Sequence, residues 1–147
     1  PGTMEGMIVY NRYNLLGTIE KNTDAGIYGR LDKTEELFGK KELVETAAKE
    51  EIVTGPAKMR CFLEDEIREF DIEVMKVDQE TAEINKGMMI RVTDEELLEK
   101  TGGIIQGMSG SPILQNGKLI GAVTHVFVMD STKGYGIFAE TMLEQLK

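Results

Sequence analysis

The chain has 147 residues, 41% of them hydrophobic and 29% charged, which is typical of one globular domain with a real core. A formal net charge of -9 argues against a nucleic-acid partner, because such partners are bound by clustered Lys and Arg. The single cysteine, Cys61, excludes an internal disulfide and a cysteine-paired metal site, and no apolar run of about 18 residues could span a membrane. We expect no metal and no cofactor.

The first third of the chain alternates short apolar runs with Asn and Gly. Runs at residues 7–10, 15–19 and 26–29 are rich in β-branched or aromatic residues and predict strands. Residues 34–51 carry apolar side chains at roughly helical spacing, so a helix is expected over part of this stretch, although Gly39 weakens it.

From Gly55 onward the pattern has the period of two that strands show. Residues 57–63 and 70–74 predict a hairpin joined by a turn at 64–66, and residues 88–92 predict a further strand. Thr93 and Glu96 fit a capping box, with Thr93 as the cap of a helix over 95–100 that ends at Gly102-Gly103.

The last third predicts more strands. Asn116-Gly117 is a strong hairpin signal between short apolar runs at 113–114 and 119–120. Residues 122–128 are nearly all apolar and predict a buried strand, and 141–147 predict a helical turn or two. The expected fold class is therefore mostly β, with small helices.

The segment Gly107-Met-Ser-Gly-Ser-Pro112 lies between two of these apolar runs. Glycines on both sides of Ser109 indicate a tight turn that presents a hydroxyl, and its backbone N–H groups could converge as an oxyanion hole requires. A plain hairpin turn would use the same residue types. Local composition alone does not separate the two interpretations.

A serine nucleophile also needs a base and usually an orienting carboxylate. The only histidine, His125, lies in an apolar strand, where a packed or hydrogen-bonded wall residue is the more common role. Asp94 could orient a base, or it could be a cap or first-turn acid of the following helix. A thiol hydrolase that pairs Cys61 with His125 is a weaker hypothesis, because nothing near Cys61 indicates a low thiol pKa.

Residues 101–136, TGGIIQGMSGSPILQNGKLIGAVTHVFVMDSTKGYG, closely resemble the signature region of the stage IV sporulation protein B (SpoIVB) peptidases. Shorter matches precede this run, and residues 33–52 match least well. The matches are Gly17-Thr18-Ile19 with Asn22, Gly26-Ile27-Tyr28-Gly29, Gly55-Pro56-Ala57 and Lys86-Gly87-Met88 leading into Thr93-Asp94.

The resemblance implies a serine endopeptidase with a chymotrypsin-like (trypsin-like) β-barrel fold. Gly-Met-Ser-Gly-Ser-Pro is similar to the Gly-Asp-Ser-Gly-Gly-Pro pattern of chymotrypsin-like enzymes. The match implies that Ser109 is the nucleophile, that the N–H groups of Gly107 and Ser109 form the oxyanion hole, and that Asp94 is the acidic triad member. Thr124 and His125 would then line the substrate cleft, with Thr124 offering backbone hydrogen bonds to an extended peptide.

The family's catalytic histidine lies in an upstream Gly-His segment that this sequence does not contain, and Pro1-Gly2-Thr3 resembles the Pro-Gly-Glu stretch that follows it. Residues 1–147 are therefore expected to be a single domain, the C-terminal portion of the peptidase domain, following that histidine and a PDZ domain. Pro1 would be a processing site or a fragment boundary. Without the general base we expect an inactive or nearly inactive chain.

The family further implies limited cleavage of protein regulators in sporulation signalling, between the forespore and mother-cell membranes, and self-cleavage. The alternative function is a non-catalytic module of the same fold that binds a peptide by edge-strand addition. An incomplete barrel would leave unpaired strand edges, which favour a dimer or a strand swap.

Overall fold

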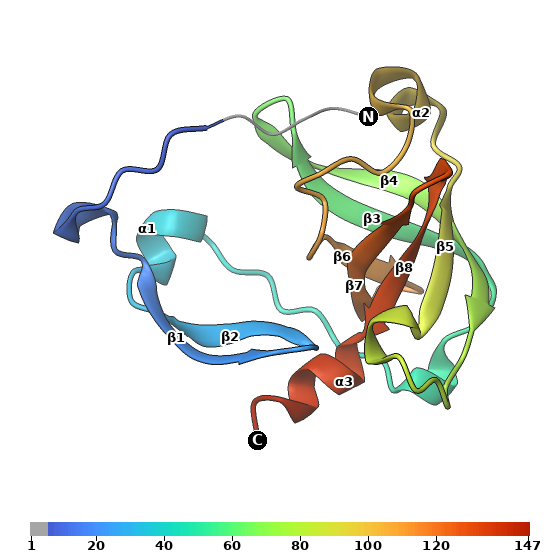
Figure 1. Cartoon of the computed structure of the whole chain (residues 1–147), viewed down its shortest axis with the longest axis horizontal. Helices are drawn as coiled ribbons and strands as arrows, with labels where there is room; N and C mark the ends of the chain where they lie inside the picture. Colours follow the sequence, from blue (N-terminus) through green and yellow to red (C-terminus); the bar gives the residue numbers. More distant parts are fainter. Residues whose placement is uncertain (1–5) are drawn as a thin grey trace.

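A computed structural model describes residues 6–147, so the sequence match at Pro1-Gly2-Thr3 lies outside the described residues. Its main body is a closed antiparallel barrel with the strand order β3-β4-β5-β8-β7-β6 (Figure 1). The barrel strands are β3 (Gly55–Leu63), β4 (Glu66–Val77), β5 (Met88–Val92), β6 (Pro112–Gln115), β7 (Lys118–Phe127) and β8 (Asp130–Phe138). The expectation of a mostly β barrel with short helices is confirmed. The described residues form one closed barrel rather than an open one.

The β3–β4 hairpin follows directly from the alternation in its sequence. Met59 pairs with Phe70, and both side chains are buried in the barrel interior. Glu64 and Asp65 form the connecting turn with φ angles of 53° and 65°, which match the right-handed twist of the two strands. The predicted hairpin and the predicted strand β5 are both confirmed.

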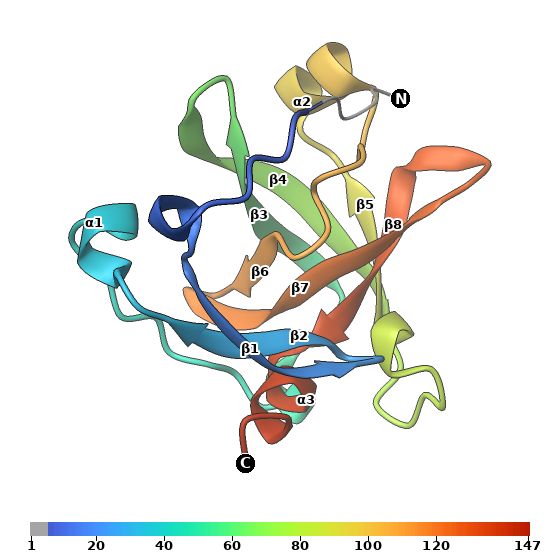
Figure 2. The ribbon, with the colours of Figure 1, turned by 60° about the vertical axis from the view of Figure 1, so that its left-hand side comes forward.

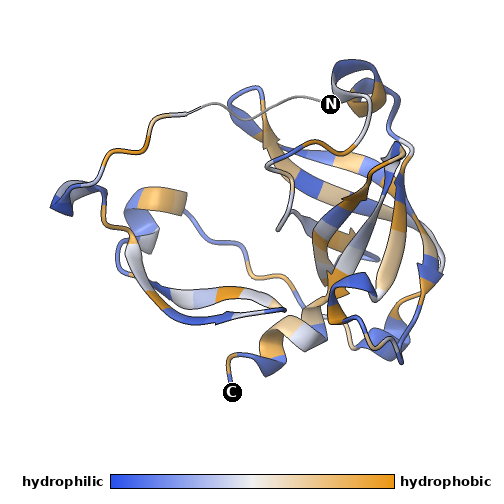
Figure 3. Cartoon of the chain, in the orientation of Figure 1, coloured by the Kyte–Doolittle hydropathy of each residue, from blue (hydrophilic) through white to orange (hydrophobic). Residues whose placement is uncertain are grey.

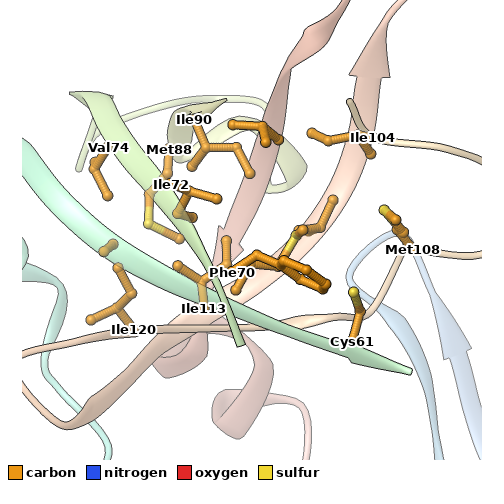
Figure 4. Packing of buried hydrophobic residues seen from close by; sticks show 14 of the residues in the cluster. Cys61, Phe70, Ile72, Val74, Met88, Ile90, Ile104, Met108, Ile113 and Ile120 are labelled. Atoms are coloured by element: carbon orange, nitrogen blue, oxygen red, sulfur yellow. The ribbon is translucent and has the colours of Figure 1, made fainter. Parts of the chain in front are cut away.

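The core fills the barrel with aliphatic, methionine and phenylalanine side chains (Figure 4). Hydropathy alternates along β3, β4 and β5, so one face of these strands lines the core (Figure 3), whereas β6, β7 and β8 contain consecutive buried residues. The largest side chains with under 2% exposure are Phe70, Met59, Ile72, Met88, Ile90, Leu97, Ile113, Ile120, Ile137, Val74 and Val123. Full burial of such side chains contributes about 1.5–3 kcal/mol each and is the main stabilising term.

The barrel closes at a short seam between β3 and β6. Only two residue pairs form this ladder, Lys58 with Leu114 and Met59 with Ile113. The buried Gln115 amide continues the seam, because its Nε2 donates to the carbonyl oxygens of Val53 (2.8 Å) and Pro56 (3.2 Å). Its Oε1 accepts from the Val53 N–H (3.1 Å). These hydrogen bonds offset the cost of burying the amide and tie β6 to the segment that leads into β3.

A smaller two-stranded sheet, formed by residues 17–31, lies beside the barrel (Figure 2), and its residues Ala25 and Tyr28 pack against Ala122 and Ile137 of the barrel. Strands β1 (Gly17–Thr23) and β2 (Gly26–Leu31) pair in a two-stranded sheet that leaves several apolar side chains exposed. Residues 7–10 form no strand, so that expectation was wrong. The expected helix is limited to α1 (Thr34–Phe38), because Gly39 follows it at φ 59° and ends the helical path. The short 3-10 turns are Arg12–Asn14, Lys49–Glu51 and Ile84–Lys86.

The helix before the serine segment is α2 (Glu95–Thr101), and its N-cap is Asp94 rather than Thr93. Thr93 was the wrong cap because the chain enters the helix one residue later than the capping-box pattern suggested. The predicted stop at Gly102 is confirmed, since Gly102 adopts the left-handed conformation at φ 72°. The closing helix is α3 (Ala139–Glu144), close to the expected position. Among residues 6–147, no helix is long and apolar enough to cross a membrane.

Candidate active site

The segment that carries Ser109 runs from the end of α2 to the start of β6 and lies along β7 and β8 (Figure 2). Its first part is fastened to β8: the N–H of Ile104 donates to the Ser131 carbonyl oxygen (2.7 Å), and Ser131 Oγ donates to the Gly102 carbonyl oxygen (2.9 Å). Ile104 and Met108 are buried in the core. Packing of these two side chains in the core therefore anchors the turn that leads into β6.

The turn itself is held against β7 by backbone hydrogen bonds. The Gly110 N–H donates to the Val123 carbonyl oxygen (2.7 Å), and the Val123 N–H donates to the Ser111 carbonyl oxygen (3.0 Å). Gly107 and Gly110 have φ angles of 97° and 88°, which side-chain-bearing residues rarely adopt. The glycines on both sides of Ser109 are thus required by the backbone conformation of the turn.

Two N–H groups of this turn are left without an acceptor. The Met108 N–H donates to the Ile105 carbonyl oxygen (3.2 Å). The N–H groups on either side of it, those of Gly107 and Ser109, donate to no other residue within 6–147. Both of these residues are exposed. Unpaired backbone donors on alternate residues next to a serine hydroxyl are suited to binding an oxyanion.

The Ser109 hydroxyl is exposed and donates to the carbonyl oxygen of Thr124 (3.2 Å). Ser109, expected as the nucleophile, and Thr124, expected in the substrate cleft, therefore lie next to each other. His125 is also exposed on β7, but its imidazole makes no hydrogen bond with Ser109 or with any other part of the chain that the structure describes. In this structure Ser109 has no base as a partner.

Asp94 lies at the start of α2 and its carboxylate serves two backbone donors. Its Oδ1 accepts from the Leu97 N–H (3.0 Å), which is the N-cap bond. Its Oδ2 accepts from the Asp71 N–H on β4 (3.1 Å). No hydrogen bond joins it to Ser109 within the described chain. The structure thus brings Ser109, Gly107 and Thr124 together, and places Asp94 in a separate backbone-binding role.

Charged side chains hold α2 against the β3–β4 hairpin. Arg68 on β4 pairs with Glu96 on α2, and its guanidinium also lies over the Phe70 ring at 5.1 Å. Lys100 on α2 pairs with Glu64 in the hairpin turn and with Glu96. The hydrogen bonds from Arg68 and Lys100 lower the pKa of Glu96 to about 2. The helix from which the serine segment departs is therefore tied to β4 at several points.

The end of β7 near Ser109 is an open strand edge that the sequence pattern did not reveal. Strand β6 pairs with β7 only as far as Ala122, and β7 continues to Phe127. On the β6 side, residues 124–127 have no strand partner among the described residues. The sequence pattern predicted a buried strand over 122–128, but His125 and Val126 are exposed, as the resemblance implied for His125. An extended peptide could add to this edge beside the serine hydroxyl.

Cys61 does not contribute to this site. Its thiol lies in the barrel core, and burial raises the thiol pKa, which disfavours the thiolate needed for nucleophilic attack. The hypothesis of a Cys61–His125 thiol hydrolase therefore has no structural support. Within residues 6–147 no group of three His, Cys, Asp or Glu side chains is placed to hold a metal ion.

Comparison with known proteins supports the expected chymotrypsin-like fold and identifies the family of the chain. The family model described as SpoIVB peptidase S55 matches residues 1–143. The chain is similar to the crystal structure of the Rv3671c protease from M. tuberculosis in its active form, with a TM-score of 0.60 at 15% identity. That match covers 88% of this chain and 56% of the other.

Two further structures of Rv3671c show the same fold. A serine-to-alanine mutant from M. tuberculosis H37Rv in an inactive form has a TM-score of 0.56 at 14% identity and is covered over 62% of its length. The inactive form of the protease has a TM-score of 0.56 at 15% identity and is covered over 65%. Each match covers 88% of this chain, which therefore spans less than two thirds of these structures. No curated protein sequence is significantly similar to the chain.

Proposed function

The chain belongs to the SpoIVB peptidase S55 family, and on this premise we propose that it is the nucleophile-bearing part of a serine endopeptidase with Ser109 as the nucleophile. The single observation that carries the proposal is the pair of unpaired N–H groups on Gly107 and Ser109 beside the exposed Ser109 hydroxyl. In the reaction, Ser109 Oγ gives its proton to the general base as it attacks the scissile carbonyl carbon. The developing oxyanion takes hydrogen bonds from the two N–H groups. Collapse of the tetrahedral intermediate breaks the C–N bond, the base passes the proton to the leaving amine, and water then hydrolyses the acyl-enzyme.

Substrate would bind as an extended peptide along the free edge of β7. The Thr124 carbonyl oxygen, which now accepts from Ser109 Oγ, would accept a peptide N–H from the substrate. Thr124 is itself fixed, because its Oγ1 donates to the Asn85 carbonyl oxygen (2.6 Å). His125, as the next residue, would form part of the cleft wall.

The proposed acidic triad member is Asp94, by its match to the family position. Its carboxylate now accepts from Leu97 and Asp71, so an interaction with a histidine would require one of those two bonds to be exchanged. The general base would come from the family's upstream Gly-His segment. Because His125 does not contact Ser109 in the described structure, the chain by itself is proposed to be inactive or nearly so.

The family further supports limited cleavage of protein regulators in sporulation signalling, in the space between the forespore and mother-cell membranes. This physiological role is a proposal that rests on family membership alone. The edges of the β1–β2 sheet, together with the open edge of β7 at residues 124–127, are unpaired strand edges through which the proposed dimer or strand swap could form.

The test uses two proteins: this chain alone, and this chain joined to the upstream segment that carries the family's histidine. The joined protein should be labelled at Ser109 by a fluorophosphonate probe and should cleave a protein substrate. The chain alone should be labelled slower by at least about 10²-fold, the low end of a general-base contribution. Ser109→Ala should abolish both labelling and cleavage in the joined protein.

The second candidate function is a non-catalytic module that binds a peptide along the open edge of β7. The unpaired strand at residues 124–127 favours it. Continued inactivity of the joined protein, together with peptide binding that persists in Ser109→Ala, would support the module and exclude the enzyme. Rapid labelling of the chain alone would instead show that a base is present within residues 1–147.

A further inference from the structure

Two tight turns meet at Met108, in the segment between α2 and β6. The Ile105 carbonyl oxygen accepts from the Met108 N–H (3.2 Å), and the Met108 carbonyl oxygen accepts from the Ser111 N–H (3.0 Å). Gly107 and Gly110 are the third residues of the two turns, and their φ angles of 97° and 88° have the positive sign that this position of a type II turn requires. Both backbone hydrogen-bonding groups of Met108 are therefore bound within the segment.

These bonds set the direction of the Ser109 N–H, one of the two donors of the proposed oxyanion hole. The Ser109 N–H and the Met108 carbonyl belong to one peptide unit, and in a trans peptide the N–H and the C=O point in opposite directions. Because the Met108 carbonyl points toward the Ser111 N–H, the Ser109 N–H points away from Ser111. The other donor, the N–H of Gly107, lies in the turn that ends at Met108.

The side chain of Met108 is the only one in residues 107–110 that packs in the core. Gly107 and Gly110 have no side chain, and the Ser109 side chain is exposed. The Met108 side chain is 5% exposed and belongs to the core cluster, where it lies on the side of Cys61 (Figure 4). Glycine permits many backbone conformations, so the two glycines by themselves would not hold the turns in one arrangement. Burial of the side chain between them supplies that constraint.

We infer that Met108 is a positioning residue of the proposed peptidase, because its buried side chain holds the Gly107 and Ser109 N–H groups in the arrangement that binds the oxyanion. It acts through the two peptide units next to it rather than by contact with the reacting atoms. The site therefore requires an apolar side chain of similar volume at position 108. The inference rests on the proposed function and adds a residue to the proposed site.

The first measurement uses the chain alone and does not depend on catalysis. Backbone order parameters from NMR relaxation report how rigidly each N–H is held, with about 0.85 for rigid backbone and below about 0.6 for flexible backbone. The N–H groups of Gly107 and Ser109 should be rigid in the wild type and should fall below about 0.6 in Met108→Ala. Met108→Leu should keep them rigid, because exchange of methionine for leucine nearly conserves volume.

The second measurement compares kcat and KM in the joined, active protein. Met108→Ala should lower kcat per folded molecule by at least about 10²-fold, the cost of losing one oxyanion-hole donor. KM should stay the same, because these donors act on the transition state and not on the bound substrate. Met108→Leu should restore kcat to near the wild-type value.

Met88→Ala is the matched control, because Met88 is 0% exposed in the same cluster but lies on β5, away from Met108 (Figure 4). It should destabilise the protein while the order parameters of Gly107 and Ser109 and kcat per folded molecule stay unchanged. Order parameters or a kcat of Met108→Ala that equal those of the wild type would overturn the inference. A Met88→Ala protein as impaired at the turn as Met108→Ala would also overturn it.

Failure of the proposed function gives a different result. An inactive joined protein, or cleavage that survives Ser109→Ala, would refute the proposed function. The order parameters of the chain alone would still decide whether Met108 holds the two N–H groups.

Discussion

Substitution of Asp94 separates its two candidate roles, the N-cap of α2 and the acidic member of a catalytic triad. The first role predicts a loss of stability when Asp94 is replaced, and the second predicts a loss of activity. Asp94→Ala removes the N-cap bond from Leu97, worth about 1 kcal/mol. It also removes the bond from the Asp71 N–H, worth about 1 kcal/mol. The free energy of unfolding should therefore fall by about 2 kcal/mol in urea denaturation of the chain. Asp94→Asn keeps one acceptor oxygen and should lose about 1 kcal/mol.

Thr93→Ala is the control for this experiment. The sequence pattern makes Thr93 the cap, but within the described residues its side chain makes no hydrogen bond and it is exposed. Its removal should change the free energy of unfolding by less than about 0.5 kcal/mol. A cost for Thr93→Ala that equals or exceeds that for Asp94→Ala would refute the assignment of the cap and the reasoning built on it.

The same variants decide the catalytic role in the joined, active protein. If Asp94 orients the histidine, kcat of Asp94→Asn should fall by about 10² or more, well beyond the change in folded fraction. If Asp94 only anchors α2, kcat per folded molecule of Asp94→Asn should equal that of the wild type. A normal kcat would remove Asp94 from the triad while leaving Ser109 in place.

Three further substitutions test the fold around the site. Gly102→Ala should cost about 1 kcal/mol, because φ is 72° but a Cβ there meets no atom within 4 Å; a neutral result in urea denaturation would contradict the left-handed cap. Gly121→Ala should cost about 3 kcal/mol or more, since its Cβ would lie 2.0 Å from the Ile137 carbonyl oxygen on the partner strand, and a melting temperature like that of the wild type would contradict this packing. Glu96 has a folded pKa of about 2, below its ordinary value of 4.5, through its bond to Arg68. The stability that ionised Glu96 contributes is thus present above about pH 4.5 and is lost as the pH falls toward 2. Glu96→Gln should therefore have a lower melting temperature than the wild type at pH 7. A difference in melting temperature that is the same at pH 7 and pH 2 would argue against the ion pair.

The elements that the sequence predicted well are those set by local pattern. The period of two in residues 57–63 and 70–74 specified a hairpin because neighbouring strands bury alternate side chains. Helix α2 was found from its glycine stop. Its cap was misplaced by one residue, because Thr93 and Asp94 are both good cap residues and only the Leu97 and Asp71 N–H groups decide between them.

The elements that the sequence did not predict depend on contacts between distant segments. The open edge at residues 124–127 exists because β6 is shorter than β7, which the composition of β7 does not reveal. For the Ser109 turn, the family resemblance implied the role of nucleophile. The positive φ angles of Gly107 and Gly110 show why glycines are needed on both sides of Ser109.

The short seam between β3 and β6 has a consequence for the dynamics of the serine turn. Strand β6 begins at Pro112, directly after the turn, and two residue pairs with the Gln115 amide close the barrel there. Local opening reactions start where few hydrogen bonds must break at once. We expect the amide hydrogens of Ile113 and Leu114 to exchange with solvent earlier than those of the long β3–β4 hairpin. Strand β6 is also paired with β7 along its length, so such an opening would free the strand that follows the Ser109 turn on its β3 side while its β7 side stays paired.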